Sequence, residues 1–387
     1  MDNFTFYNPT KIYFGKDSIT SLDTELKQYG KNVLLVTGCS FADSSGLKKS
    51  VVDQLESLGK RVIELDGIKP NPRVESVRAG VKMVRDSSVD FILALGGGSV
   101  LDASKAIALA SNYSKDPWDL FIKKATTNAI LPIGAILTVA ATGSEANGNT
   151  VISNLASNKK LALYNPSLYP TFSILDPTYS QTLPYYPTVC GVVDIMIHIL
   201  EQYFHKVENS PIQDGFQESL LKAIMTNGLI VKDDLTNYDA RSNLMWGSTL
   251  ALNGILKAGI RGDFSSHQIE HEISAYYDIA HGEGLSIIFL AWMRKVFPFN
   301  VAKFKQFAIN VFDVSPTGKD DQQIILEGIS HLEKFFQNLK IATRLSEVKI
   351  DSKHFQDMAQ SVIDRSPDHA LVKLTERFVI ELLESAL

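Results

Sequence analysis

Short apolar runs alternate with helical stretches up to about residue 180, and this alternation then stops. The runs are NVLLVTG (32–38), RVIELDG (61–67), FILALGGGS (91–99), AILPIGAIL (129–137) and TFSILDP (171–177). Strands that are separated by helical stretches imply parallel βαβ units, because a parallel connection must cross over the sheet. The first part of the chain is therefore expected to form an open, mostly parallel sheet.

Long amphipathic stretches follow, with almost no strand signal. They cover residues 188–206, 211–229, 239–257, 265–277, 283–295, 300–312, 320–339 and 370–386. This pattern predicts an α/β Rossmann-like nucleotide-binding domain at residues 1–180 and an all-α domain at residues 181–387. The join is expected in the Pro- and Tyr-rich segment LDPTYSQTLPYYP, residues 175–187.

Composition excludes several classes of function. The 387 residues carry a net charge of −5 and no Lys/Arg run longer than isolated pairs, so nucleic acid and anionic membranes are disfavoured as partners. The N-terminus lacks a basic segment followed by an apolar one, and no apolar stretch is long enough to span a bilayer. Two cysteines, Cys39 and Cys190, give no disulfide framework, and we expect a cytoplasmic protein.

Three glycines stand where a strand runs into a helix, in LALGGGSVLDASKAIAL (93–109). Glycines let backbone N–H groups approach a pyrophosphate, and the helix N-terminus adds partial positive charge. The segment is neither GxGxxG nor a P-loop, and a turn that only packs tightly is the alternative. A second polar loop, TVAATGSEAN (138–147), also follows an apolar strand, so both loops are expected at one edge of the sheet, where open α/β sheets bind ligands.

Ionisable side chains interrupt two apolar helical segments. Asp194 and His198 share a helix face in GVVDIMIHILEQ, and His267, His271 and His281 lie within fifteen residues of each other. One carboxylate and several imidazoles, with no thiolate, suit Zn(II) or Fe(II) and leave a coordination position open. Satisfied core histidines are the alternative at each position. The remaining histidines stand in polar surroundings and are expected at the surface: His205, His331, His354 and His369.

These motifs together resemble the iron-containing alcohol dehydrogenase family, in its butanol dehydrogenase and aldehyde reductase branch. The resemblance rests on FYNPTKIYFG near the start, KPNPRVESV (69–77), LGGGSVLDASKAIA (95–108), TGSEAN (142–147), ILDP (174–177), GVVDIMIHILEQY (191–203) and HQIEHEISAYYDIAHGEGLSI (267–287). It implies a dehydroquinate synthase-like fold and metal ligands at Asp194, His198, His267 and His281. It leaves His271 outside the ligand set, as the catalytic residue that positions or relays a proton.

The resemblance also implies where a nicotinamide cofactor binds. Gly96, Gly97, Gly98 and Ser99 would hold its pyrophosphate. Other residues would line the cofactor or approach its ribose: Asn71, Thr138, Thr142, Asn147 and Lys160. Asp102 and Lys105 belong to the same family motif, with a surface pair on the helix as the alternative.

The choice of cofactor is argued from the end of the first strand. An acid there would bind the ribose hydroxyls and repel a 2′-phosphate, whereas this chain has Gly38, Cys39 and Ser40. We therefore favour NADP(H) over NAD(H), with Gly38 and Ser40 in the binding site. Asp43 is close enough along the chain to keep NAD(H) open.

The expected activity is hydride transfer between NADP(H) and primary alcohols or aldehydes of the butanol and butanal type, assisted by Fe(II) or Zn(II). The alternatives are an NAD-linked glycerol or polyol dehydrogenase, a lyase of the dehydroquinate synthase type, and a non-catalytic nucleotide-binding or metal-storage protein. The lyase needs basic residues around its metal, and few occur near these motifs. A homodimer is also expected, with NFTFYNPTKIYFG (3–15) either contacting the second copy or forming an internal hairpin.

Overall fold

The computed structural model describes residues 1–39, 46–127, 130–363, 365 and 369–387. By contacts, the chain divides into two compact units. The sheet unit comprises residues 7–188 and 234–253, and the helical unit comprises residues 1–6, 189–233 and 254–387. The domain division at residue 180 stays a prediction, because compactness alone does not show that either part folds by itself.

The sheet unit contains a six-stranded sheet in which every pair of neighbours is parallel. Its order is β1-β8-β5-β4-β2-β3, and the strands are β1 (Lys11–Phe14), β2 (Asn32–Gly38), β3 (Arg61–Ile68), β4 (Phe91–Gly96), β5 (Ile133–Leu137) and β8 (Phe172–Leu175). The expected α/β class is thereby confirmed. The internal hairpin considered for residues 3–15 is wrong, because β1 runs parallel to β8 at the sheet edge.

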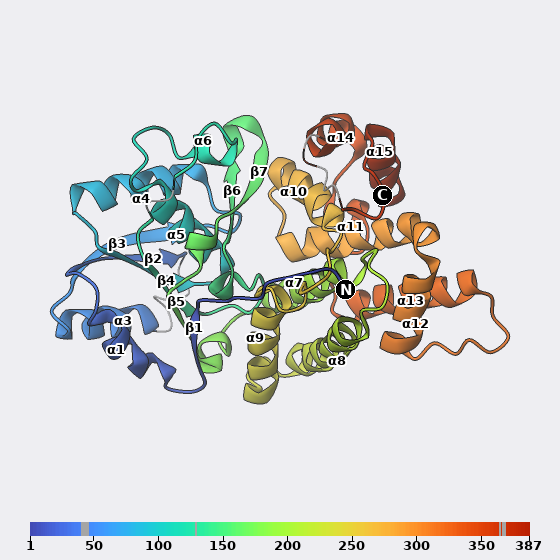
Figure 1. The fold of residues 1–387 in the computed structure, drawn as a ribbon, viewed down its shortest axis with the longest axis horizontal. Helices are drawn as coiled ribbons and strands as arrows, with labels where there is room; N and C mark the ends of the chain where they lie inside the picture. The colour runs from blue at the N-terminus through green and yellow to red at the C-terminus, as the bar shows by residue number, and fades with distance from the viewer. Residues whose placement is uncertain (40–45, 128–129, 364, 366–368) are drawn as a thin grey trace. The chain divides into compact units, whose positions relative to one another are not determined.

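Helices cover both faces of this sheet (Figure 1). One face packs against α1 (Leu22–Leu26) and α3 (Leu47–Ser57), and the other packs against α4 (Val74–Asp86) and α5 (Gly98–Ala110). Successive side chains of a strand point to opposite faces, and β2 shows this directly. Val33 and Leu35 lie in one core, and Leu34 and Val36 lie in the other.

Four further elements of the sheet unit were not foreseen in this form. Strands β6 (Asn149–Asn154) and β7 (Lys159–Tyr164) pair antiparallel in a separate two-stranded sheet. Their sequence mixes Asn, Ser and Lys with apolar residues, which hides the strand pattern. The short α6 (Trp118–Phe121) lies before β5, and α9 (Tyr238–Leu252) belongs to this unit although it follows the sheet in sequence.

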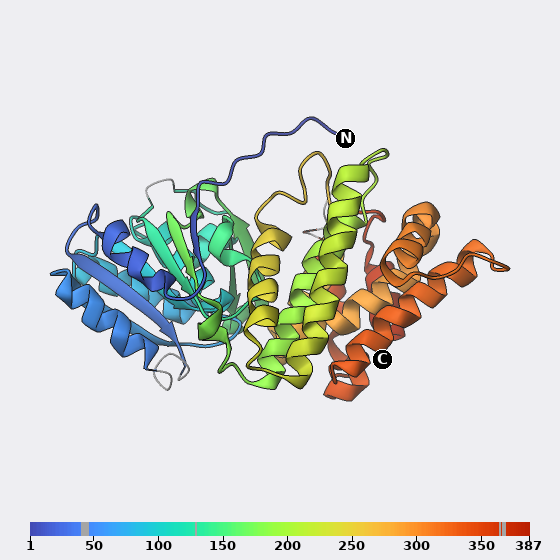
Figure 2. The same cartoon turned by 90° about the horizontal axis from the view of Figure 1, so that it is seen from below.

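The helical unit is built from helices, as the sequence predicts, although the helix at Phe355–Ile363 lies in a stretch where none was expected. They are α7 (Tyr185–Tyr203, which begins in the sheet unit), α8 (Pro211–Asp233), α10 (Ser265–Tyr277), α11 (His281–Val296), α12 (Val301–Phe312), α13 (Asp321–Asn338), α14 (Phe355–Ile363) and α15 (Glu376–Ser385). Helices α12 and α13 lie side by side (Figures 1 and 2). None of the described helices is both long and apolar enough to cross a membrane.

An aromatic cluster forms part of the core of this unit. The ring of Phe204 stacks on that of Phe304 at 4.1 Å and contacts Phe289, Trp292 and Phe307. Because aromatic side chains bury large areas and pack in fixed geometries, this cluster holds α11 and α12 firmly against the end of α7. The predicted ligand residues of α7 and α11 are thus carried on well-packed helices.

Candidate active site

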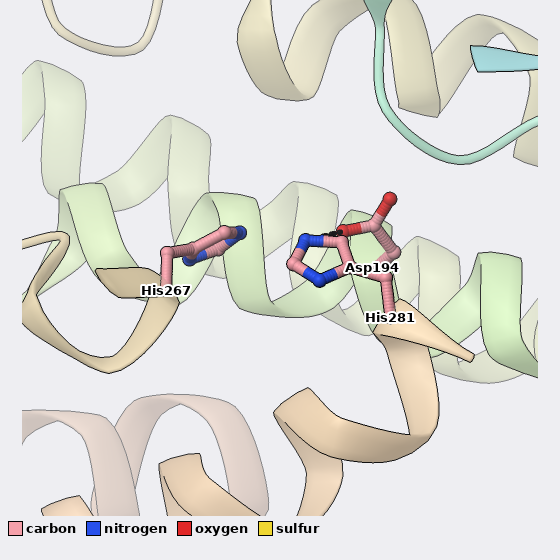
Figure 3. Close-up of side chains that lie close together, drawn as sticks. All are labelled: Asp194, His267 and His281. Atoms are coloured by element: carbon pink, nitrogen blue, oxygen red, sulfur yellow. Dashed lines mark ion pairs between the residues drawn. The ribbon is translucent and has the colours of Figure 1, made fainter. Parts of the chain in front are cut away.

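Three of the four predicted metal ligands converge in the helical unit. Asp194 lies on α7, His267 on α10 and His281 at the start of α11, and one potential ligand atom of each lies within 4.8 Å of the others (Figure 3). The Nε2 atom of His281 lies 3.9 Å from Oδ1 of Asp194. A carboxylate and two imidazoles at this spacing can share one divalent cation.

His198 stands directly beside this group. It follows Asp194 by one helical turn, and its Nδ1 lies 3.5 Å from Oδ1 of Asp194. Its ring stacks on that of His267 with centroids 4.8 Å apart. Burial, reinforced by the neighbouring imidazoles of His267 and His281, holds the pKa of His198 well below its ordinary value. A neutral imidazole is the form that binds a metal.

Unsatisfied ring atoms indicate that a cation fits here. Nε2 of His267 and Nδ1 of His198 are both buried, and neither has a hydrogen-bond partner within the described residues. Leaving such an atom unpaired costs about 1–3 kcal/mol, so a ligand is expected to satisfy it. The nitrogen and oxygen donor set suits Fe(II) and Zn(II).

His271 lies one turn after His267 on α10, and its ring centroid is 5.4 Å from that of His281. It is buried and belongs to a second group of close ligand atoms with Glu270 and His281. The predicted catalytic residue is therefore next to the candidate metal ligands.

Two buried glutamates complete the group. Glu201 contacts the ring of His267, and Glu270 contacts the ring of His281. Sequence reasoning missed both. The signal was present for Glu201, which follows Asp194 by seven residues and so falls on the same helix face in an otherwise apolar run.

One expectation about histidines is wrong. His205, expected at the surface, is buried, and its Nε2 lies 3.2 Å from Oδ1 of Asp214. The polar residues that follow it in sequence misled the prediction, because Ser210 and Asp214 fold back to contact its ring.

The three glycines where β4 passes into α5 make close contacts that a side chain would prevent. A Cβ added to Gly97 would lie 2.9 Å from Val139, and one added to Gly98 would lie 2.5 Å from the side chain of Thr142. Helix α5 begins at Gly98, so Ser99 lies in its first turn. Free backbone N–H groups at such a helix start suit a phosphate.

The polar loop after β5 meets this glycine turn, as expected. The backbone N–H of Thr138 donates to the carbonyl of Gly96 at 3.1 Å, which brings the ends of β4 and β5 together. Thr142 accepts a hydrogen bond from the N–H of Ser144, and Asn147 donates to the carbonyl of Gly143. The loop is thus held by its own side chains.

Asp102 and Lys105 are buried beneath this loop, which excludes the surface-pair alternative. Asp102 accepts from the hydroxyl of Ser144 at 2.7 Å and from the N–H of Val151 at 3.0 Å. The ammonium of Lys105 donates to the carbonyls of Ser144, Asn147 and Asn149. Burial lowers the pKa of Lys105 to about 8, and the carboxyl groups of Asp102 and Glu145 oppose this shift.

The other predicted cofactor residues occupy separate places in the sheet unit. Gly38 ends β2 and pairs with Ile68 of β3, Asn71 is buried in a left-handed turn (φ 50°) between β3 and α4, and Lys160 is buried on β7. Ser40 and Asp43 lie outside the described residues. The assignment of all these residues to a cofactor stays a prediction.

Comparison with known proteins decides the family. The model of iron-containing alcohol dehydrogenases matches residues 9–177, and that of the C-terminal domain of the Fe-containing alcohol dehydrogenase family matches residues 188–387. The chain belongs to the iron-containing alcohol dehydrogenase family. It is therefore an oxidoreductase of the alcohol dehydrogenase class, which confirms the family and the enzyme class expected from its motifs.

Relatives within the iron-containing alcohol dehydrogenase family match the chain over nearly its whole length. A probable NADH-dependent butanol dehydrogenase 1 of Bacillus subtilis is 43% identical and covers 100% of both chains. An NADPH-dependent aldehyde reductase of Escherichia coli is 36% identical, covering 99% of this chain and 97% of its own. The crystal structure of the NADH-dependent butanol dehydrogenase A of Thermotoga maritima superposes with a TM-score of 0.95 at 36% identity, covering 100% of this chain and 99% of its own.

Proposed function

We propose that this protein is a metal-dependent alcohol dehydrogenase and aldehyde reductase that transfers hydride between NADP(H) and primary alcohols or aldehydes of the butanol and butanal type. The observation that carries the proposal is the convergence of Asp194, His267 and His281 from three helices, with a buried unsatisfied nitrogen on His267. The names of the relatives, butanol dehydrogenase and aldehyde reductase, support the substrate class.

The residues of the helical unit have two roles, metal binding and proton transfer. Asp194, His198, His267 and His281 would hold one Fe(II) or Zn(II) ion. When bound, such an ion supplies Lewis-acid polarisation of an alcohol or aldehyde oxygen. His271, whose ring lies beside that of His281, would hold or move a proton at the substrate oxygen.

In the sheet unit the glycines hold the nicotinamide cofactor. Gly96, Gly97, Gly98 and Ser99 would bind its pyrophosphate at the start of α5, and the Thr138–Asn147 loop would flank it. The cofactor itself would accept or donate the hydride, and these backbone contacts would orient it relative to the substrate, which hydride transfer requires.

The structure adds an argument for NADP(H). Glu64 and Asp66, the acidic residues of the neighbouring strand β3, are both bound by Lys48 at 2.7 Å. The hydroxyl of Thr37 also donates to Asp66 at 2.6 Å. Both carboxylates are therefore engaged with the protein, and Asp66 is held at Thr37, the residue before Gly38, where an acid would oppose a 2′-phosphate. The names of the relatives do not support this preference, because the butanol dehydrogenases at 39–43% identity are named NADH-dependent and the aldehyde reductase at 36% identity is named NADPH-dependent.

Anaerobic cofactor oxidation tests the proposal. The purified protein, stripped of metal and reloaded separately with Fe(II) or Zn(II), is given butanal with NADPH and, in parallel, with NADH. Faster oxidation of NADPH that disappears on chelation and in a His267→Ala variant is expected. The matched control is His331→Ala, which removes an exposed imidazole of α13 and should retain activity.

Two results would overturn parts of the proposal. Faster oxidation of NADH would refute the preference for NADP(H), and rapid oxidation of glycerol with NAD would favour the polyol dehydrogenase alternative. No oxidation of either cofactor by metal-loaded protein, over several aldehydes, would refute the redox activity and favour the lyase or the non-catalytic alternative. Homodimer formation and a cytoplasmic location stay predictions for sedimentation and cell fractionation.

A further inference from the structure

Each of two candidate ligand histidines is held by a buried glutamate. Glu201, on α7, is fully buried, and its Oε1 accepts from the backbone N–H of His267 at 3.0 Å and lies 3.1 Å from Nδ1 of the same residue. The hydroxyl of Ser266 also donates to this oxygen. One carboxylate oxygen therefore fixes both the backbone and the ring of His267.

Glu270, on α10, holds His281 in the same manner. Its Oε2 contacts Nδ1 of His281, and its Oε1 accepts from the hydroxyl of Ser274. The first turn of α11 leaves room for this carboxylate, because a Cβ at Gly284 would lie 2.7 Å from Oε1 of Glu270. A glycine at this position thus permits the contact between the two helices.

These contacts determine which ring nitrogen faces the metal site. Where a carboxylate oxygen accepts from Nδ1 of a histidine, that nitrogen carries the hydrogen. The lone pair then lies on Nε2. In His267 this atom is buried without a hydrogen-bond partner in the described ranges, and in His281 it faces Asp194. Both rings therefore have Nε2 available to bind a metal ion.

The pattern links three helices in sequence. Helix α7 provides the ligand Asp194 and the glutamate that orients His267 on α10. Helix α10 in turn provides Glu270, which orients His281 on α11. Burying a carboxylate in a helix core costs several kcal/mol, so its presence between ligand helices calls for a compensating role.

We propose that Glu201 and Glu270 are positioning residues that fix the ring orientation and tautomer of His267 and His281 and thereby set the affinity of the metal site. The inference rests on the proposed function, since it concerns the same site. Outer carboxylates of this kind raise the basicity of an imidazole ligand and reduce its freedom to rotate.

Metal affinity tests this inference without recourse to activity. The dissociation constant of Zn(II) is measured on metal-free protein by competition with a chromophoric chelator. Glu201→Ala and Glu270→Ala are each expected to weaken binding by about 10- to 100-fold. Glu201→Gln and Glu270→Gln keep an acceptor oxygen but lose the charge, so about a tenfold loss is expected.

Asp214→Asn is the matched control. It also removes a buried carboxylate that is bonded to an imidazole, but that imidazole is His205, which is outside the ligand set. Its Zn(II) affinity should equal that of the wild type. The visible absorption of the Co(II)-substituted protein should shift in the glutamate variants and stay unchanged in Asp214→Asn, because only the former alter the ligand field.

Far-UV circular dichroism of the metal-free proteins shows which variants fold. If an alanine variant does not fold, the Zn(II) affinity of the corresponding glutamine variant tests the inference in its place. Folded Glu201 and Glu270 variants that bind Zn(II) as tightly as the wild type, with an unchanged Co(II) spectrum, would overturn the inference. A His267→Ala variant separates this failure from failure of the proposed function. If His267→Ala also binds normally, then the metal site itself is wrongly assigned.

Discussion

Lys105 donates from its buried ammonium group to both the carbonyl and the hydroxyl oxygen of Ser144, at 2.6 and 2.8 Å. This contact ties the helix after the glycines to the loop after β5. Together with the hydrogen bond from Ser144 to Asp102, this contact fixes the two loops expected to hold the cofactor to one another.

Replacing Lys105 by methionine should destabilise the sheet unit. The substitution leaves three carbonyl oxygens without their donor and removes the stronger of the two cations that act on Asp102, so we expect a loss of about 3–5 kcal/mol in the free energy of unfolding. Urea denaturation measures this loss. Lys159→Met, at an exposed position of β7, is the control and should stay within about 0.5 kcal/mol of the wild type. Equal stability of the two variants would contradict the role given to Lys105.

Gly98→Ala should weaken cofactor binding. The new Cβ would lie 2.5 Å from the side chain of Thr142, so the loop after β5 must move away from the start of α5. We expect the dissociation constant of NADPH, measured by fluorescence titration, to rise about tenfold, or about 1.4 kcal/mol. Gly215→Ala on α8 meets no atom within 4 Å and should leave binding unchanged. Unaltered affinity in Gly98→Ala would show that the cofactor does not depend on this turn.

The contribution of Asp214 to stability should vanish in acid. Burial raises the pKa of this carboxyl, but hydrogen bonds from His205, Lys303 and Ser210 outweigh it and hold the pKa well below its ordinary value. The folded protein then binds fewer protons than the unfolded chain at low pH, so the stabilisation is complete above about pH 4 and is lost as the pH falls further.

Asp214→Asn measures this effect. Because Lys303 loses its buried partner at 2.6 Å, we expect the free energy of unfolding to fall by about 3 kcal/mol at pH 7. The difference between variant and wild type should shrink below pH 4, as followed by urea denaturation across pH. A difference that stayed constant from pH 7 to pH 3 would be inconsistent with a lowered pKa.

Removing the metal should lower the stability of the folded protein. A cation that binds the folded state alone stabilises it by about 2.7 kcal/mol when its free concentration is a hundred times the dissociation constant. Thermal unfolding of Zn(II)-loaded protein with and without chelator should therefore differ in Tm. In His267→Ala the two curves should coincide. Identical curves for the wild type, with bound metal verified by elemental analysis, would argue against a cation at this site.

Local sequence was sufficient for the architecture and for much of the site. The alternation of strands and helices before residue 180 predicts the parallel sheet, because hydrophobic periodicity and turn residues are local features of the sequence. The spacing of Asp194 and His198, and of His267 and His271, follows directly from the helical repeat. The family motifs then identified a specific set of metal ligands. The structure brings these residues close together, and a measurement of metal binding is needed to test the set.

Only the tertiary structure decided which polar residues are buried and with whom they pair. Lys105 looks like a surface lysine and His205 like a surface histidine, yet segments distant in sequence cover both. Glu201 and Glu270 acquire their partners because α7, α10 and α11 pack together. Such pairings depend on contacts between elements far apart along the chain, and the cost of burying charge makes them specific. The sequence of a helix shows which residues share a face, but it does not show which residues of other helices will contact that face.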